Sequence, residues 1–97
     1  MRLPDLAFSD YFLDHNHRHN IDEEDVLDAI YGRRILITRE YFEDGKRRRR
    51  IYAKNDEAYL RIIVEPTDEG FWWILSAYPA NRSEMKRMRQ CRVGDEE

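Results

Sequence analysis

The sequence lacks the features on which disulfide-rich and membrane-spanning proteins depend. A single cysteine, Cys91, excludes an internal disulfide and any zinc site built from several cysteines. No apolar run approaches the roughly 18 residues that a membrane helix needs. The first residues also lack the apolar stretch of a secretory signal peptide. We therefore expect a cytoplasmic protein with no membrane partner.

Glycine and proline are scarce as well, with four and three residues among 97. They form no linker, and the chain contains no internal repeat, so nothing marks a domain boundary. Hydrophobic residues make up 41% of the chain and charged residues 38%, which suits a thin core under an ionic surface. These features predict one domain over residues 1–97, with residues 93–97 as a frayed tail.

Charge is distributed unevenly along the chain. The net charge of −3 argues against a general nucleic-acid binder. However, residues 1–30 hold eight acidic residues against two basic ones, residues 46–50 are all basic, and residues 82–92 hold five basic residues against one acidic residue. One face can therefore attract a polyanion while the whole chain stays acidic. The alternative is a solvated edge that stays free of ligand.

Two helices are predicted before the first strand. Aromatic and histidine residues at helical spacing predict an amphipathic helix over Ser9–Arg18. Asp22 is a suitable N-cap for a second helix, whose acidic first turn favours the positive end of the helix dipole. Gly32 is expected to end that helix. Its inner face is expected to contain Val26, Leu27 and Ile30.

The pair Asp44-Gly45 predicts a type I′ hairpin turn between strands Ile35–Phe42 and Arg47–Lys54. A two-residue loop fixes which residues face each other across the hairpin. The expected pairs are Glu43 with Lys46, Glu40 with Arg49, Ile37 with Tyr52, and Leu36 with Ala53.

Two further strands are predicted at Tyr59–Glu65 and Phe71–Tyr78, followed by a basic helix that Asn81 or Ser83 can cap. Consecutive apolar residues in Phe71–Tyr78 predict a central strand that is covered on both faces. The expected fold class is α+β: an antiparallel four-stranded meander with two N-terminal helices on one face and one C-terminal helix, in the order ααββββα.

Three segments resemble the BrnT toxins, members of the RelE-like toxin superfamily. His19–Val26 is similar to the family's His-Gly-Ile/Val step into a helix with an acidic start. Arg47–Tyr52 is similar to the family strand that carries an arginine. Ile74–Glu84 resembles the closing pattern Ile-Ile-Ser-Ala-Arg-x-Ala-Thr-x-x-Glu. The resemblance implies a RelE-like fold.

The sequence also departs from the family pattern. Asn20 stands where the family usually has glycine, and Tyr78 replaces the arginine after Ser-Ala. The tyrosine of the family's final helix is missing, and its short N-terminal strand is not evident. A sister group of the BrnT toxins fits the same pattern. Catalytic activity depends most on Tyr78.

The resemblance implies the toxin of a type II toxin–antitoxin system, a metal-independent ribonuclease that inhibits translation. It implies a cognate antitoxin and RNA as partners and no cofactor, with a homodimer inside the toxin–antitoxin complex left open. The alternative is a noncatalytic protein- or RNA-binding module on the same fold.

Metal-free RNA cleavage needs groups that move protons and cations that stabilise the phosphorane. Strand alternation places Arg48 and Arg50 on one face and Arg47 and Arg49 on the other. We expect one of these pairs to form a phosphate-binding surface with Tyr78 and the basic helix. The predicted catalytic residues are Arg50, Tyr78, Arg82 and His19. The predicted nucleic-acid-binding residues are Arg47, Arg48, Arg49, Lys86 and Arg89.

Two histidines raise the question of a metal. His15 and His19 have the i,i+4 spacing that places two ligands on one helix face. Spacing suggests no third ligand, so we expect no metal site. His19 is instead a candidate general acid or base, because histidine titrates near neutral pH.

Overall fold

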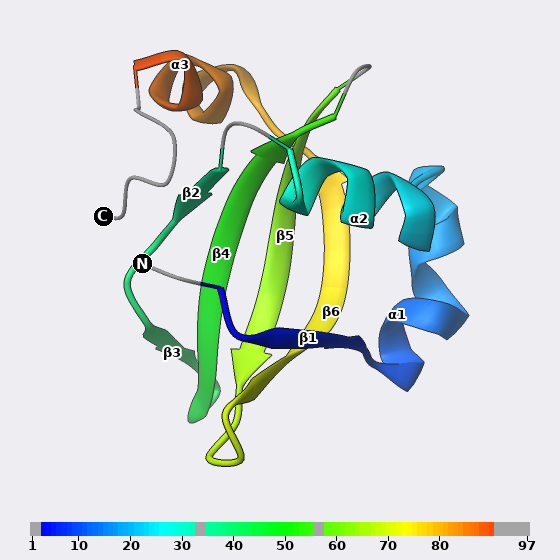
Figure 1. The fold of residues 1–97 in the computed structure, drawn as a ribbon, viewed down its shortest axis with the longest axis vertical. Coiled ribbons are helices and arrows are strands. Elements are labelled where there is room, and N and C mark those ends of the chain that lie inside the picture. Colours follow the sequence, from blue (N-terminus) through cyan, green and yellow to red (C-terminus); the bar gives the residue numbers. More distant parts are fainter. Residues whose placement is uncertain (1–2, 33–34, 56–57, 91–97) are drawn as a thin grey trace.

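A curved six-stranded sheet forms the centre of the molecule (Figure 1). The computed structural model describes residues 3–32, 35–55 and 58–90. The elements are β1 (Asp5–Phe8), α1 (Asp10–His15), the 3-10 helix η1 (Asn16–His19), α2 (Glu23–Ile30), β2 (Ile35–Ile37), β3 (Tyr41–Glu43), β4 (Lys46–Lys54), β5 (Tyr59–Pro66), β6 (Phe71–Pro79) and α3 (Arg82–Gln90). The strand order is β1-β6-β5-β4-β2, and β3 pairs with another part of β4.

The predicted α+β class is confirmed, but the predicted order ααββββα and the four-stranded meander are wrong. The chain begins with a strand, β1, which runs parallel to β6 and adds an edge to the sheet. The hairpin region contributes two short strands, β2 and β3, in place of one long strand. The strands β4, β5 and β6 form the antiparallel meander that the sequence predicts.

The first helix is shorter than the predicted Ser9–Arg18. Ser9 caps α1, which ends at His15. The chain then tightens into η1, because the buried Asn16 side chain bonds to backbone groups of other segments. Its Nδ2 donates to the carbonyls of Ile21 and Ala77, both at 3.1 Å, and its Oδ1 accepts from Ala77 N at 2.7 Å. Asn16 therefore fastens the end of the first helix to β6.

The second helix begins as predicted. The Asp22 side chain caps α2, and Asp25 completes a capping box with it. The inner face is formed by Val26, Ala29 and Ile30, whereas the predicted Leu27 is 37% exposed. Gly32 follows the C-cap, where an added Cβ would lie only 3.0 Å from the carbonyl oxygens of Ala29 and Lys54.

The β3–β4 turn is confirmed as type I′, since Asp44 and Gly45 have φ angles of 53° and 75°. Glu43 faces Lys46 as predicted. Further along, the predicted pairs are wrong by one residue: Ile37 faces Ile51, and Leu36 faces Tyr52. An extra residue between β2 and β3 forms a bulge at residues 38–40, so the predicted pairing of Glu40 with Arg49 is lost.

The two faces of the sheet are covered differently. The helices α1 and α2 pack on one face, over the main hydrophobic core (Figure 1). A smaller cluster of Leu36, Tyr52 and Met88 joins the other face to α3. Along β6, buried Trp72 and Ile74 alternate with half-buried residues, so the prediction that both faces of this strand are covered is wrong.

Two sequence predictions concern the membrane and the C-terminal tail. None of the helices formed by residues 3–32, 35–55 and 58–90 is long and apolar enough to cross a bilayer. The predicted frayed tail, residues 93–97, lies outside the described residues, as does Cys91.

Candidate functional site

The face of the sheet opposite α1 and α2 carries a hollow of about 640 Å³. Because α3 contacts this face mainly through Leu36 and Tyr52, the strands beside it remain open. We call this hollow the sheet groove. The strands β3 to β6 contribute most of its wall, including Tyr41, Arg48, Arg50, Arg61, Ser76 and Tyr78. Tyr11 of α1, Lys46 and the carboxylates of Glu43, Asp44 and Glu65 also line it.

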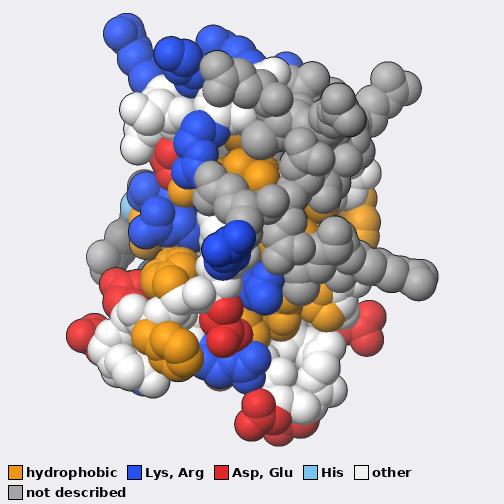
Figure 2. Space-filling view, turned by 90° about the vertical axis from the view of Figure 1, so that its left-hand side faces the viewer, with side chains coloured by type: hydrophobic (Ala, Val, Ile, Leu, Met, Phe, Trp, Pro, Cys, Tyr) orange, Lys and Arg blue, Asp and Glu red, His pale blue; other side chains and the backbone are white. Residues whose placement is uncertain are grey.

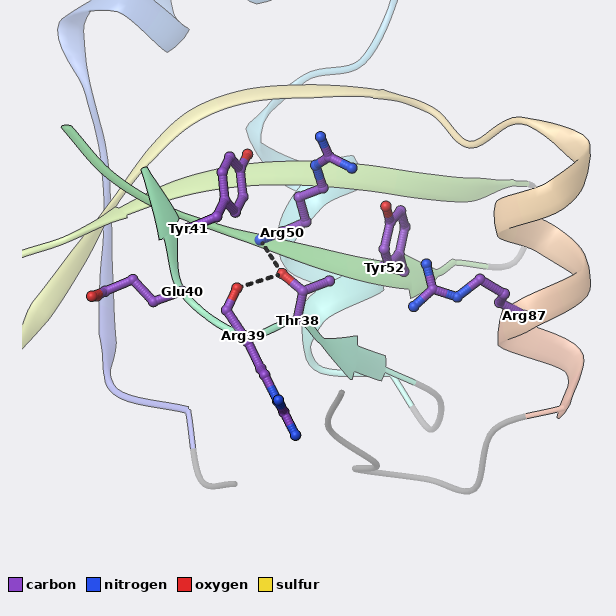
Figure 3. A pocket seen from close by; sticks show the side chains of 7 residues that line it. All are labelled: Thr38, Arg39, Glu40, Tyr41, Arg50, Tyr52 and Arg87. Carbon is purple, nitrogen blue, oxygen red and sulfur yellow. Dashed lines mark hydrogen bonds between the residues drawn. The ribbon is translucent and has the colours of Figure 1, made fainter. Parts of the chain in front are cut away.

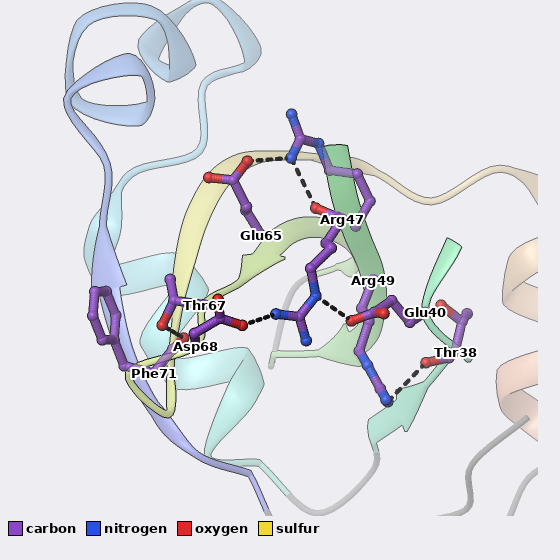
Figure 4. A network of polar contacts seen from close by, with 9 residues as sticks. Thr38, Glu40, Arg47, Arg49, Glu65, Thr67, Asp68 and Phe71 are labelled. Atoms are coloured by element: carbon purple, nitrogen blue, oxygen red, sulfur yellow. Dashed lines mark hydrogen bonds and ion pairs between the residues drawn. The ribbon is translucent and has the colours of Figure 1, made fainter. Parts of the chain in front are cut away.

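Strand alternation divides the four arginines of β4. Arg48 and Arg50 line the sheet groove. Arg47 instead forms ion pairs with Glu40 at 2.9 Å and Asp68 at 3.0 Å (Figure 4). Arg49 lies 5.4 Å from the Trp72 ring and donates a hydrogen bond of 3.3 Å to the Thr38 carbonyl (Figure 4). Of the two pairs considered from the sequence, the structure therefore places Arg48 and Arg50 in the groove.

The two groove arginines of β4 have different surroundings. Arg48 is largely buried and forms a 2.6 Å ion pair with Glu65. Arg50 is exposed, and its guanidinium lies 5.2 Å from the Tyr41 ring. Hydrogen bonding to Tyr52, then to Tyr41, raises the pKa of Arg50 above its ordinary value. Arg50 is therefore a fixed, accessible cation in the groove.

Tyr78 is held between a cation and an imidazole. The Arg61 guanidinium lies 5.1 Å from its ring, and the His19 ring meets it edge-on at 4.3 Å. His19 does not line the groove itself; it contacts the edge of Tyr78, which does. The three side chains come from η1, β5 and β6 and meet at one end of the groove.

A buried carboxylate connects this end of the groove to α3. Glu84 and Asn81 form a reciprocal capping box with two 2.9 Å hydrogen bonds, so Asn81 caps α3 as predicted. The second Glu84 oxygen lies 3.7 Å from Arg61. Burial, and next a hydrogen bond to Glu84, raises the pKa of Tyr52. Among the described side chains, the buried Nε of Arg61 has no hydrogen-bond partner.

A second hollow, of about 480 Å³, lies at the bulge between β2 and β3 (Figure 3). We call it the bulge pocket. Tyr52 and Arg87 line it, and it shares Tyr41 and Arg50 with the sheet groove. The Arg87 guanidinium lies 5.7 Å from the Tyr52 ring. Figure 2 shows Lys and Arg side chains down this side of the molecule, from α3 toward the β3–β4 hairpin.

The structure brings together some of the predicted site residues. Arg48, Arg50 and Tyr78 line the groove, and His19 contacts Tyr78. Arg82 and Lys86 are exposed on α3 and line neither hollow. Arg89 is exposed on α3, with its guanidinium 5.9 Å from the Tyr59 ring. Arg47 and Arg49 lie on the other side of β4.

Several site residues were not singled out from the sequence: Tyr41, Tyr52, Arg61, Glu84 and Arg87. A signal existed for Arg61, which alternates with the apolar residues Leu60 and Ile62 and so faces the side opposite the core. A signal also existed for Tyr41, because the type I′ turn places it opposite Arg48. Glu84 has the capping-box spacing to Asn81, which indicates a helix start, whereas Arg87 carries no comparable local signal.

The histidines are not arranged as a metal-binding pair. His15 ends α1, where its Nδ1 lies 3.0 Å from the Tyr11 carbonyl and its ring stacks on Tyr11 at 4.3 Å. His19 belongs to η1, where the α-helical i,i+4 geometry no longer applies. Within the part of the chain that the structure describes, no three His, Cys, Asp or Glu side chains group to hold a metal.

Chemically, the groove and pocket combine accessible guanidinium groups with the faces and hydroxyls of several tyrosines. Guanidinium groups bind phosphate oxygens, and aromatic rings stack on bases. The surface is thus suited to a single-stranded nucleic acid. No protein-family model matches the sequence, and no curated protein matches it significantly.

Proposed function

We propose that this protein is the toxin of a type II toxin–antitoxin system, a metal-independent ribonuclease that binds single-stranded RNA in the sheet groove and inhibits translation. The observation that carries the proposal is the convergence of Arg48, Arg50, Arg61 and Tyr78 in one open groove. The resemblance to BrnT toxins supports it, and the RelE-like arrangement of sheet and helices is part of the proposal.

In the proposed reaction, the 2′-oxygen attacks the adjacent phosphorus while the bond from phosphorus to the 5′-oxygen breaks. The products are a 2′,3′-cyclic phosphate and a free 5′-hydroxyl. Arg50, with Arg48, stabilises the negative charge of the phosphorane. The 2′-hydroxyl proton passes to His19, and Tyr78 donates a proton to the leaving oxygen. Arg61 holds the Tyr78 ring in position.

The proposed partners follow from charge. RNA is the substrate, and the exposed cation Arg50 also suits an acidic segment of a cognate antitoxin, which would inhibit the protein by covering Arg50. Both partners place the protein in the cytoplasm. A toxin dimer inside the complex is compatible with this arrangement.

A noncatalytic RNA-binding module is the second candidate. Two observations favour it: His19 is not part of the groove wall, and Arg48 is already paired with Glu65 at 2.6 Å. In this case, the groove binds RNA through Arg50 and Arg61 without cleaving it. Tyr78 then acts as a stacking platform for a base.

RNA cleavage in the presence of EDTA tests the proposal. End-labelled single-stranded RNA is incubated with the protein, and the products are resolved by length and by end group. The double variant Arg48→Ala/Arg50→Ala should lose about 10²–10³-fold in rate, as expected when transition-state donors are removed. Arg47→Ala/Lys54→Ala is the matched control, because neither residue lines a hollow, and it should keep nearly full activity.

The outcomes separate the two candidates. Cleavage that is lost in Arg48→Ala/Arg50→Ala and kept in the control supports the toxin. RNA binding that depends on the same two residues, with no cleavage by the natural sequence, supports the binding module. If RNA is neither bound nor cleaved, both candidates are wrong.

A further inference from the structure

The bulge pocket is a built feature of the hairpin. Between the pairs Tyr41–Arg48 and Ile37–Ile51, the β2–β3 side has one residue more than β4. Thr38 holds this bulge, because its hydroxyl accepts from Arg50 N at 3.0 Å and donates to the Arg39 carbonyl at 3.2 Å (Figure 3). Thr38 N also donates to the Arg50 carbonyl at 2.9 Å. The pocket wall is thus fixed by the backbone.

Two cation–aromatic pairs line this pocket. Arg50 lies 5.2 Å from the Tyr41 ring, and Arg87 lies 5.7 Å from the Tyr52 ring. Figure 3 shows the Arg87 side chain extending from α3 toward Tyr52, whereas the Arg39 side chain extends away from Tyr41 and Arg50. Arg39, Arg50 and Arg87 therefore supply positive charge to the pocket, which Glu40 also lines. Its accessible aromatic surface comes from the half-buried Tyr41, because Tyr52 is only 2% exposed.

The pocket and the sheet groove are neighbours. Tyr41 and Arg50 line both hollows and form the ridge between them. A volume of about 480 Å³ lies in the range of small-ligand sites, which is roughly 300–1,000 Å³. A chain that binds along the groove therefore meets a second compartment of suitable size beyond Arg50.

We propose that the bulge pocket is a second nucleotide subsite, which binds the nucleotide that flanks the one in the sheet groove. Its ligand combines a planar base with a phosphate. The base stacks on Tyr41, the half-buried tyrosine of the pocket, and the phosphate pairs with Arg87. Arg50, on the ridge, binds the phosphate that joins the two nucleotides. This inference rests on the proposed RNA binding of the groove.

The test measures the binding of a fluorescein-labelled single-stranded RNA octamer by anisotropy, across a range of salt concentrations. Arg87→Ala should weaken binding by about tenfold and reduce the salt slope by about 0.7, the value for one phosphate contact in single-stranded RNA. Lys54→Ala is the matched control, since Lys54 is an exposed cation of β4 that also lies over a tyrosine ring, Tyr59 at 5.1 Å, but lines neither hollow. It should change neither quantity appreciably.

A second measurement follows the pocket directly. Uridine monophosphate is titrated into the protein, and the ring signals of Tyr41 and Tyr52 are followed by NMR. Both should shift in the natural sequence and in Lys54→Ala, and neither should shift in Arg87→Ala. This titration also tests whether the pocket binds a single nucleotide without the rest of an RNA chain, which a nucleotide subsite should do.

Failure of the subsite and failure of RNA binding in the groove give different results. If Arg48→Ala/Arg50→Ala weakens octamer binding while Arg87→Ala behaves like Lys54→Ala, the subsite is wrong and the groove remains. If the octamer does not bind at all and the monophosphate shifts neither tyrosine, the proposed function fails and the subsite fails with it. Circular dichroism of Arg87→Ala confirms that the variant is folded.

Discussion

The two arginine pairs of β4 have the same side chain and opposite surroundings. Arg47 and Arg49 are occupied by carboxylates, a carbonyl and the Trp72 ring (Figure 4). Arg48 and Arg50 lie on the face that carries the sheet groove. The contrast extends to the whole sheet, where one face holds the core and the other is only partly covered. Arg48 is nevertheless paired with Glu65 at 2.6 Å, and Arg50 is the exposed member of its pair. An available arginine is therefore identified by the face of its strand together with its exposure.

The largest effect is expected on the covered face. Ile62 is fully buried in the main core, and Ile62→Ala should lower the free energy of unfolding by about 2–5 kcal/mol. The neighbouring Ile63 lines the groove and is half-buried, so Ile63→Ala should cost clearly less. Urea unfolding at pH 7 measures both. Equal losses would mean that the groove face is packed as tightly as the core.

The next effect concerns the open face and its chemistry. Tyr78→Phe removes the hydroxyl that is proposed to protonate the leaving oxygen, while the ring contacts with Arg61 and His19 remain. Cleavage should fall by about 10²-fold or more, with RNA affinity nearly unchanged. Tyr31, which is 75% exposed, offers the control Tyr31→Phe, which should keep full activity. A parallel loss of affinity and rate would instead make Tyr78 a binding residue.

A smaller effect, on the pH dependence of stability, is expected at Tyr52, which packs under α3 on the groove face. Burial and the Glu84 contact raise the folded-state pKa of Tyr52, so the folded protein holds this proton to higher pH than the unfolded chain does. The resulting stability is present below about pH 10, the ordinary tyrosine pKa, and is lost as the pH rises through the folded-state pKa.

Chemical denaturation between pH 8 and 11 measures this loss. Tyr52→Phe should flatten the fall in unfolding free energy with pH, and Tyr31→Phe should leave it unchanged. An unchanged slope in Tyr52→Phe would show that another group titrates there.

The smallest effect is expected for the occupied arginines. Arg47 is 39% exposed and Asp68 is 98% exposed, so their ion pair is screened by solvent. Arg47→Ala should cost at most about 1 kcal/mol of stability and leave RNA affinity unchanged. Thermal unfolding and the anisotropy titration measure the two quantities. A loss of affinity as large as that of Arg50→Ala would remove the distinction between the two pairs.

Local features of the fold were predictable from the sequence. The acidic start of α2 and the Asp44-Gly45 turn depend on residues within a few positions of each other, and both are present. The N-terminal strand of the BrnT pattern, which is not evident from the sequence, is present as β1. Among the described strands it pairs with β6 alone, far along the chain, so neighbouring residues did not reveal it. The bulge at residues 38–40 contains neither glycine nor proline, so no turn residue marked the change of register.

The candidate site was also predictable only where it depends on local sequence patterns. Arg48, Arg50 and Tyr78 could be named from strand alternation and from the resemblance to a toxin family. Their neighbours Arg61 and Glu84 come from β5 and from α3, and only the tertiary structure brings them together. The register shift also moved Tyr52 from the expected partner Ile37 to Leu36, which placed it in the cluster under α3.

The pairing of β1 with β6 also has a kinetic consequence. The first strand cannot join the sheet until β6, the last of the described strands, has been made, and the Asn16–Ala77 hydrogen bonds join residues 61 positions apart. Contacts between distant segments slow folding, because chain entropy is lost before the contacts form. The meander β4–β5–β6 can assemble earlier from neighbouring residues. During synthesis, the apolar side chains of Leu6 and Phe8 therefore stay unpacked until β6 has left the ribosome. We expect β1 to be the last strand to join the sheet.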